Sequence, residues 1–235
     1  MIYYIGDTHF GHANVIKHDG RPFETVEEMD EAIIRNWNRR VHKDDDVYVL
    51  GDFCFRNTES CSWYLQKLMG RKHLIVGNHD IKLLKDEKAL SMFESVDNMT
   101  VIRDNGKQIT LCHYPMAAWD GSHHGSWHIY AHIHNNDSPV ARYMFSLPYA
   151  VNAGCMIHYY TPVTFEEMLK NYQIFVRNTL MPYAPGDTAY IIRNSAVTEV
   201  EVQDIDTIHM LIKVGNSWVK AVEVYQNREI IEKCN

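Results

Sequence analysis

Three short apolar runs in the first eighty residues each end at a glycine that precedes an aspartate or asparagine. The runs are Ile2–Ile5, Val47–Leu50 and Leu74–Val76. Continuous β-branched and aromatic runs of this length are typical of strands that are covered on both faces. Amphipathic segments lie between them, and this alternation predicts an α/β fold in which the three runs are strands.

The helical segments carry recognisable start signals. Apolar residues recur at helical spacing from Val26 to Val41, and Thr25 with Glu28 forms a capping box before them. A second helix is predicted at Ser62–Met69, and a third begins after Thr164 and continues toward Tyr172. Further strands are predicted near Thr100–Ile102, Gln108–Cys112, Ile129–Ala131 and Ala150–Ala153.

The pattern changes after a turn-rich stretch at residues 181–187. The following β-type runs are separated by the hairpin-like pairs Asn194-Ser195 and Gly215-Asn216. The β-type runs are Ala189–Ile192, Ala196–Val202, His209–Val214 and Trp218–Val224. We therefore expect two domains, a catalytic α/β domain at residues 1–175 and a small β-barrel or β-meander module at residues 183–235.

Net charge and apolar content limit the partners of the chain. The formal net charge of -7 argues against a general nucleic-acid binder, because phosphate contacts need clustered lysine and arginine. The chain begins without a signal-peptide pattern, and no apolar run approaches the length of a membrane span. These features predict a soluble, cytoplasmic protein without membrane contact.

The cysteines do not form a zinc-binding pattern. The five are widely scattered, and no CxxC pair occurs. Cys54 and Cys61 could pair in an oxidising compartment, but reduced thiols in a cytoplasmic protein are the favoured interpretation. The five cysteines are Cys54, Cys61, Cys112, Cys155 and Cys234.

Metal-binding residue types follow each of the first three strands. The segments are Gly6-Asp7-Thr8-His9, Gly51-Asp52 and Gly77-Asn78-His79-Asp80. In open α/β sheets, ligands bind outside the carboxyl ends of the strands. Asp7 and His9 are two residues apart, so on a strand end they would point the same way and share one ion.

Three further histidines follow later predicted strands. His113 comes directly after Cys112, and His132 and His134 follow the strand that ends near Ala131. Together with the earlier segments they offer carboxylate, imidazole and amide donors. This mixture suits Mn, Fe, Zn, Ni or Co better than Ca or Mg. Each pair alone is weak, but five such segments in order at strand ends predict a metal site.

The ordered set of segments resembles the signature of the calcineurin-like metallophosphoesterases, over about residues 1–170. Ala131 is a departure, since that family usually has glycine before its His-x-His pair. The resemblance implies a four-layer αββα sandwich with a dinuclear metal site at one edge. The motifs that carry it are Asp7-Thr8-His9, Gly51-Asp52, Gly77-Asn78-His79-Asp80, His113 and Ala131-His132-Ile133-His134.

The resemblance also implies a role for each residue. One ion would take Asp7, His9, Asp52 and His134, and the other would take Asp52, Asn78, His113 and His132, with Asp52 bridging. A hydroxide between the two ions would then attack phosphorus. His79 corresponds to the general acid that faces the leaving oxygen, and Asp80 is its expected orienting partner.

A few residues outside this set are candidates for contact with the substrate. His123 and His124 lie in a polar, glycine-punctuated loop that either faces the substrate or covers the core. His12 and Asn14 follow His9 closely, although Asn14 could instead cap a short helix. For Arg21 and Arg56, a solvated surface role is favoured over phosphate binding.

The leading hypothesis is an enzyme that hydrolyses a phosphomonoester or phosphodiester. The chain has no large insertions between motifs, which favours a small, nucleotide-like substrate. A second hypothesis is a metal-binding scaffold with weak or no catalysis, but such proteins typically lose the general-acid histidine, and His79 is present. A third is a nuclease that acts with a DNA-binding partner, against which the acidic charge and the lack of a basic stripe argue.

Overall fold

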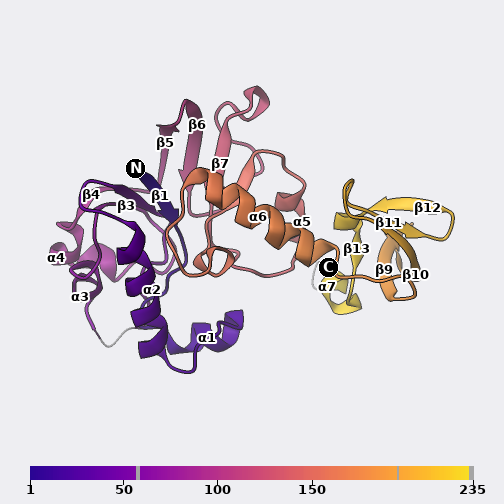
Figure 1. Ribbon diagram of the computed structural model, residues 1–235, viewed down its shortest axis with the longest axis horizontal. Coiled ribbons are helices and arrows are strands. Elements are labelled where there is room, and N and C mark those ends of the chain that lie inside the picture. Colours follow the sequence, from indigo (N-terminus) through magenta and orange to yellow (C-terminus); the bar gives the residue numbers. More distant parts are fainter. Residues whose placement is uncertain (57–58, 195, 233–235) are drawn as a thin grey trace. The chain divides into compact units, whose positions relative to one another are not determined.

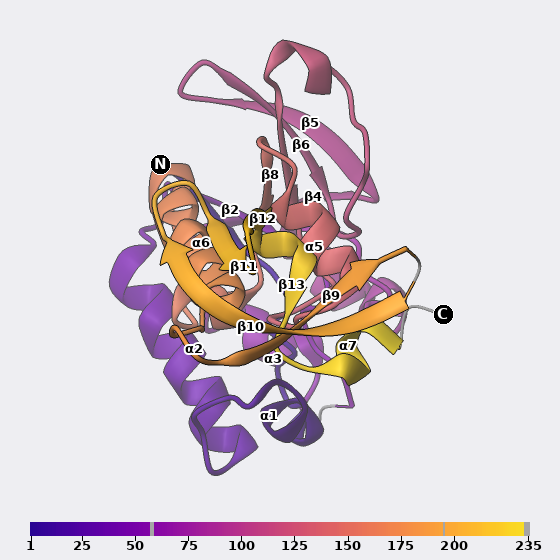
Figure 2. The same cartoon turned by 90° about the vertical axis from the view of Figure 1, so that its right-hand side faces the viewer.

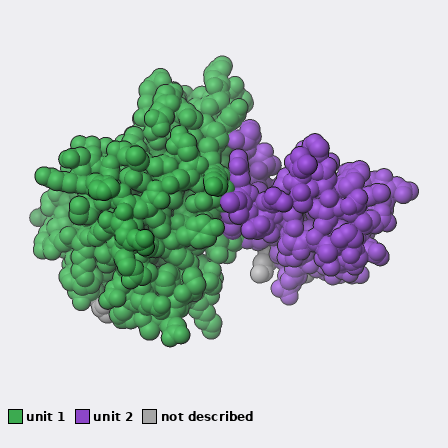
Figure 3. Space-filling model, in the orientation of Figure 1, with its two compact units in different colours: residues 1–136, 149–172 green, residues 137–148, 173–235 purple. Residues whose placement is uncertain are grey.

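The computed structural model describes residues 1–56, 59–194 and 196–232. The chain divides into two compact units, which Figure 3 shows in different colours. Unit 1 comprises residues Met1–Asn136 and Tyr149–Tyr172, and unit 2 comprises Asp137–Pro148 and Gln173–Asn235. Unit 2 thus includes a short insertion from the middle of the chain besides the predicted C-terminal module.

The first sheet of unit 1 is entirely parallel, with neighbours in the order β1-β2-β3-β4. Its strands β1, β3 and β4 are labelled in Figure 1. Its strands are β1 (Ile2–Ile5), β2 (Asp46–Val49), β3 (Arg71–Ile75) and β4 (Phe93–Asp97). The three apolar runs are strands as predicted. Because all four strands run the same way, the residues that follow β1, β2 and β3 lie at one edge of the sheet.

The second sheet has the order β5-β6-β7-β8, in which β5 and β6 form a hairpin and β6, β7 and β8 are parallel. Its strands are β5 (Met99–Asp104), β6 (Lys107–Cys112), β7 (Trp127–Tyr130) and β8 (Ala150–Asn152). Just beyond β1 and β8, Gly6 pairs with Gly154 in a parallel bridge, and the Gly6 N–H donates to the Ala153 carbonyl at 2.8 Å. The carboxyl ends of the two sheets therefore meet.

The helices of unit 1 are α1 (Ala13–Asp19), α2 (Val26–Arg40), α3 (Cys61–Leu65), α4 (Glu87–Leu90) and the first part of α6 (Phe165–Leu180). The Thr25 side chain accepts from the Glu28 N–H at 3.2 Å, so the predicted cap of α2 is confirmed. Helix α3 is shorter than predicted. Helix α6 runs beyond Tyr172 to Leu180. The single-turn 3-10 helices are Leu83–Lys85, Ser122–His124 and Cys155–His158.

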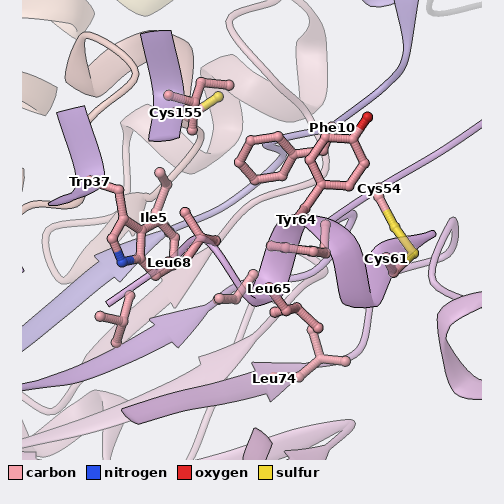
Figure 4. Close-up of a cluster of buried hydrophobic side chains, with 14 of the residues drawn as sticks. Ile5, Phe10, Trp37, Cys54, Cys61, Tyr64, Leu65, Leu68, Leu74 and Cys155 are labelled. Atoms are coloured by element: carbon pink, nitrogen blue, oxygen red, sulfur yellow. A yellow bond between two sulfur atoms is a disulfide. The ribbon is translucent and has the colours of Figure 1, made fainter. Parts of the chain in front are cut away.

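A large apolar core lies between the first sheet and helices α2 and α3. Ile5 and Leu74 from the strands contribute to the same cluster as Trp37 from α2 and Leu65 from α3 (Figure 4). Each of these four side chains is at most 1% exposed. This packing explains the continuous apolar character of the strands and holds their carboxyl ends in place.

The expectation of reduced thiols is wrong for Cys54 and Cys61, which form a disulfide (Figure 4). The turn after β2 brings Cys54 to the first residue of α3, and the two Cα atoms lie 6.2 Å apart, within bridging distance. Sequence spacing alone did not reveal this approach. Cys112 and Cys155 are buried free thiols, and Cys234 lies outside the described residues.

Unit 2 is built around an antiparallel sheet in the order β12-β11-β10-β9-β13, which forms a half-barrel (Figure 2). The long strand β10 has a register shift between Val202 and Asp204. The strands are β9 (Thr188–Arg193), β10 (Ala196–Asp206), β11 (Leu211–Val214), β12 (Ser217–Lys220) and β13 (Val224–Tyr225). The helices are α5 (Pro139–Phe145), the end of α6, the 3-10 turn Ala221–Glu223 and α7 (Arg228–Glu232).

The predicted α/β class with a C-terminal β module is confirmed. Every helix within residues 1–56, 59–194 and 196–232 is too short or too polar to span a bilayer.

Candidate metal centre

The polar segments that follow β1, β2, β3, β6 and β7 converge where the two sheets meet. Several of their side chains are removed from solvent, although all are polar or ionisable. Asp7 and His113 are fully buried, and His9 and Asp52 are at most 2% exposed. Burying so many such groups together is costly unless a charge or hydrogen bonds compensate. The seven residues predicted to hold metals are Asp7, His9, Asp52, Asn78, His113, His132 and His134.

Five of the seven ligand candidates have a left-handed backbone. β1 ends at Ile5 and β7 ends at Tyr130, so neither histidine-containing pair lies on a strand. Asp7 and His9 were expected to point the same way because side chains alternate along a strand. That reason is wrong, because the two residues lie beyond the end of β1. The positive φ angles are 51° at Asp7, 50° at His9, 51° at Asp52, 72° at His132 and 53° at His134. Such strained residues cluster at functional sites, where the surrounding structure holds them.

The two segments that carry Asp7, His9 and Asp52 are held together by main-chain hydrogen bonds. The Asp7 N–H donates to the Gly51 carbonyl at 3.1 Å, and the His9 N–H donates to the Asp52 carbonyl at 2.9 Å. The turns after β1 and β2 therefore support each other in the left-handed conformation.

Two glycines allow this close approach. Gly51 has a φ of +79°, and a Cβ on it would meet the Nδ1 atom of His113. A Cβ on Gly77 would collide with the side chain and the main-chain nitrogen of Asp52. Glycine is thus required at these strand ends chiefly for space around the ligand candidates.

The first group consists of Asp7, His9, Asp52 and His134. One donor atom from each lies within 4.8 Å of the others. The Nε2 atoms of His9 and His134 are 3.3 Å apart, and the Oδ2 atom of Asp52 is 3.7 Å from Nε2 of His9. This grouping matches the set predicted for one ion.

A second group lies on the other side of the Asp52 carboxylate. The Nε2 atom of His113 is 3.1 Å from Oδ1 of Asn78 and 3.6 Å from Oδ2 of Asp52. The ring of His132 lies 5.1 Å from that of His113, centre to centre. Asp52 therefore stands between the two groups, which is the position predicted for a bridging carboxylate.

The hydrogen bonds of two histidines determine where their lone pairs point. The Nδ1 atom of His113 lies 2.7 Å from the Leu50 carbonyl, and Nδ1 of His134 lies 2.8 Å from Oδ1 of Asp19. Both partners accept hydrogen bonds, so in each neutral ring Nδ1 carries the proton and Nε2 carries the lone pair. These lone pairs face other electron-pair donors, and a cation in each group would satisfy them. The residues present therefore fit bound metal.

The electrostatics of the first group follow from its burial. Burial, with a further contribution from His134, lowers the pKa of His9 well below its ordinary value. Burial also raises the pKa of Asp7. Burial alone would lower the pKa of His134, but the hydrogen bond to Asp19 and the charges of Asp7 and Asp19 raise it. A neutral His9 is in the form that binds a metal.

His79 lies beside the two groups. Its Nε2 atom is 4.0 Å from Oδ2 of Asp52, and its side chain is 36% exposed. Its ring lies 4.1 Å from that of Phe55 and 5.5 Å from that of His9, centre to centre. The side chain thus reaches the site while one side remains open to an incoming molecule.

The expected role of Asp80 is corrected. Its carboxylate accepts from the backbone N–H groups of Asp52, Phe53 and Gly77 at 2.8–2.9 Å, and within the described part of the chain it makes no hydrogen bond to His79. Burial raises the pKa of Asp80 to about 6. Asp80 holds the peptides on both sides of Asp52 instead of orienting the imidazole.

Of the residues expected to contact the substrate, only His12 lies near the ligand groups. Its ring is 5.6 Å from that of His9 and 4.9 Å from that of Phe55. Asn14 is exposed on α1, and the cap of that helix is His12, so Asn14 does not cap it.

His123 and His124 do not join the site. They form a 3-10 turn before β7, and His124 neighbours Lys107 and Gln108 at the start of β6. β6 and β7 are parallel, so this loop lies at their amino ends, whereas His113 and His132 follow their carboxyl ends. The connection from β6 to β7 crosses the whole sheet. For this reason, His123 and His124 are close to the His-x-His pair in sequence but not in space.

Two residues near the site were not recognised from the sequence. Arg21, expected at the surface, is 4% exposed and donates to the carbonyls of Thr8 and Asp7 at 3.0 and 2.9 Å. Asp19 accepts from both Arg21 and His134. An aspartate two residues before an arginine is a common pattern, and it does not predict that either residue lies at a functional site.

No family model matches the chain. It is 33% identical over 171 residues to the uncharacterized protein MJ1445 of Methanocaldococcus jannaschii, covering 72% of this chain and 89% of that protein. A protein of unknown function from Aquifex aeolicus, AQ665, is 28% identical, with a TM-score of 0.58, over 72% of this chain and 98% of that one. The chain belongs to the same family as MJ1445.

A solved archaeal phosphodiesterase is 16% identical to this chain. It matches with a TM-score of 0.39, over 86% of this chain and 99% of that one.

Proposed function

We propose that the protein is a metal-dependent hydrolase of phosphoester bonds with a dinuclear site. The observation that carries this proposal is the orientation of the imidazole lone pairs. In His113 and His134 the proton lies on Nδ1, so Nε2 faces the Asp52 carboxylate and Asn78 in one group and His9 in the other. Two divalent cations would satisfy these donors.

The ligands divide between the ions around Asp52. Asp7, His9 and His134 would hold the first ion, Asn78, His113 and His132 would hold the second, and Asp52 would contribute to both. Two bound ions would supply Lewis-acid chemistry, activating water and neutralising charge on the phosphoryl oxygens. Mn, Fe, Zn, Ni and Co all have suitable ligand preferences.

His79 is the proposed general acid. The imidazole of His79 is partly exposed, so it can donate a proton to the oxygen of the leaving group. This proton neutralises the negative charge that develops on the oxygen. Its backbone N–H donates to Oδ1 of Asp52 at 2.8 Å, so the segment that carries His79 is fixed to the carboxylate between the ions. Asp80 contributes by ordering the backbone around Asp52.

The proposed substrate is a small phosphomonoester or phosphodiester of nucleotide type. The motifs are separated by short connections, which leave no large inserted segment for a protein substrate. The Phe55 ring lies against both His79 and His12, and Phe55 and His12 would contact the leaving group. Cytoplasmic location and the domain boundaries at 1–175 and 183–235 stay predictions of the sequence.

We also propose the four-layer αββα arrangement for the catalytic domain. Helices α2 and α3 pack on one face of the first sheet. On the other face, the Tyr4 hydroxyl of β1 donates to Oδ2 of Asp104 in β5 at 2.9 Å. This hydrogen bond joins the two sheets across the middle of the proposed sandwich.

The test is hydrolysis of bis-p-nitrophenyl phosphate and p-nitrophenyl phosphate by protein whose metal content is measured after addition of Mn²⁺. We expect turnover of at least one ester that depends on the metal. Two bound ions with no turnover of either ester would overturn the enzyme and favour a metal-binding scaffold. Cleavage of single-stranded DNA with neither small ester hydrolysed would favour the nuclease.

A further inference from the structure

Asp19 is a buried carboxylate outside the set of proposed metal ligands. It is the last residue of α1, and its side chain is 0% exposed. Its carboxylate pairs with the buried guanidinium of Arg21 at 2.9 Å and lies 2.8 Å from the His134 ring. The side chain is therefore an ionised acceptor placed directly behind the first ligand group.

One oxygen of Asp19 binds the ring of His134. Its Oδ1 atom lies 2.8 Å from Nδ1 of His134 and 3.0 Å from Nδ1 of the exposed His18. An ionised carboxylate can only accept, so the contact selects the His134 tautomer that has its proton on Nδ1. The Nε2 lone pair is then directed at the first ligand group.

The other oxygen binds the segment after β1. Oδ2 of Asp19 accepts from Nε and Nη2 of Arg21 at 3.0 and 2.9 Å. The same guanidinium donates to the carbonyls of Asp7 and Thr8. Asp19 thus connects the turn that carries Asp7 with a histidine 115 residues further along the chain.

We infer that Asp19 is a positioning residue for the first metal, which fixes the tautomer and orientation of His134 and ties it to the turn that carries Asp7. This inference rests on the proposed function, because His134 must be a ligand. Carboxylates that hold a ligating histidine in this way commonly strengthen metal binding about 10- to 100-fold.

An alternative use of these residues is a separate cation site made by His18, Asp19 and His134, whose donor atoms lie within 4.8 Å of one another. Two observations disfavour it. The Nδ1 proton of His134 occupies the space between that ring and Asp19. The buried guanidinium of Arg21 lies against the same carboxylate and repels a second cation.

The main test replaces the carboxylate with its neutral isostere, Asp19→Asn. Long-range ¹H–¹⁵N NMR of the metal-free protein reads the His134 tautomer directly, with the signal assigned by its loss in His134→Gln. We expect protonated Nδ1 in the wild type and a mixture of tautomers in Asp19→Asn, because an amide can either accept from or donate to the ring. An unchanged tautomer in Asp19→Asn would overturn the inference.

The second readout is metal affinity, measured by calorimetric titration with Co²⁺ and by the visible spectrum of the bound ion. We expect about 10- to 100-fold weaker binding of one ion in Asp19→Asn and a changed spectrum for that ion. The other ion, held mainly by Asn78, His113 and His132, should keep its affinity. Wild-type affinity for both ions in Asp19→Asn would overturn the inference.

Two control variants separate this role from general effects. Asp30 is as buried as Asp19, since each residue as a whole is 7% exposed, but the Asp30 carboxylate accepts from the Gly11 N–H. Asp30→Asn should bind both ions with wild-type affinity, and a loss equal to that of Asp19→Asn would overturn the inference. His18→Ala should also keep both ions, whereas loss of an ion would support the separate cation site and overturn it.

Removing the charge of Asp19 leaves Arg21 buried without its carboxylate, so Asp19→Asn can fail to fold. The double variant Asp19→Asn/Arg21→Met removes the charge pair together, and the same tautomer and affinity results are expected of it. The inference and the proposed function fail in different ways. If the wild type binds no Co²⁺, both the proposed function and the inference about Asp19 are overturned. If wild type and variant both bind two ions tightly, only the inference about Asp19 is overturned.

Discussion

The Nε2 atoms of His9 and His134 face each other at 3.3 Å in the buried centre of the site. With Nδ1 of His134 donating to Asp19, its Nε2 carries a lone pair that can bind either a proton from His9 or a cation. Burial lowers the pKa of His9, which disfavours a charged imidazolium at this position. A cation shared by the two Nε2 atoms leaves both rings neutral and uses both lone pairs.

Metal should therefore stabilise the fold. We expect Mn²⁺ at a free concentration of 100 times its dissociation constant to raise the free energy of unfolding by about 2.7 kcal/mol for each ion bound. Thermal unfolding with excess EDTA and with Mn²⁺ measures the effect, with Mg²⁺ as the control of equal charge. Identical melting temperatures in EDTA and Mn²⁺ would contradict the proposed ligand set.

His79→Ala separates the ligands from the general acid. Turnover of a diester should fall about 100- to 10,000-fold, because the leaving oxygen loses its proton donor. Metal content should stay unchanged, since the ring of His79 belongs to neither ligand group. Elemental analysis and initial rates check both statements, with His124→Ala as a control that should alter neither. Loss of metal in His79→Ala would make this ring a ligand and refute the assignment.

Gly77→Ala should damage the site through lack of space. Its Cβ would strike Asp52 and lie 3.0 Å from Cε1 of His113, so we expect weaker metal binding and destabilisation on the order of 1–3 kcal/mol. Gly106→Ala is the control, because Gly106 has a φ of +79° but no atom within 4 Å of its Cβ position. It should cost about 1 kcal/mol from the backbone alone and leave metal affinity intact. Equal metal affinity in the two variants would disprove the crowding argument.

The Cys54–Cys61 disulfide should contribute to stability. The two cysteines are seven residues apart, and closing so short a loop in the unfolded chain stabilises the fold by about 2.5 kcal/mol in the chain-entropy model. Urea unfolding with and without dithiothreitol measures this difference. Cys54→Ser/Cys61→Ser should be weaker than the oxidised wild type and insensitive to the reductant. A wild type equally stable in both conditions would show that the bond does not form in solution.

Asp30 should make stability depend on pH. Burial raises its pKa to about 6 in the folded protein, from an ordinary value of 3.8. Between about pH 4 and pH 6 the folded chain retains a proton that the unfolded chain has lost, so the free energy of unfolding falls as pH rises through this window. The Asp30→Asn variant has no carboxyl group at this position, so its free energy of unfolding does not fall in this way as pH rises. We expect the variant to exceed the wild type in stability at pH 7.5 and the gap to close toward pH 4, measured by urea unfolding of metal-free protein. A gap that does not change with pH would contradict the raised pKa.

The sequence by itself determined the strands of the first sheet and the side chains that gather at its edge. Parallel strands place their carboxyl ends together, so an aspartate or asparagine after each of three apolar runs had to converge with the others. The donor types followed from the residues alone. The same reasoning failed for His123 and His124, because a connection between parallel strands crosses the sheet and its middle can lie at either end.

Only the tertiary structure decided how these side chains are held. The left-handed backbone at Asp7 and His9 depends on hydrogen bonds to the turn after β2. The residue types Asp and His do not predict this conformation. The Asp80 carboxylate accepts hydrogen bonds from backbone N–H groups, and the Asp19 carboxylate accepts one from a histidine 115 residues away. Hydrogen bonds between distant segments depend on packing, which one sequence does not encode locally. Such contacts select the tautomer of His134 and so decide which of its nitrogens is free to bind a metal.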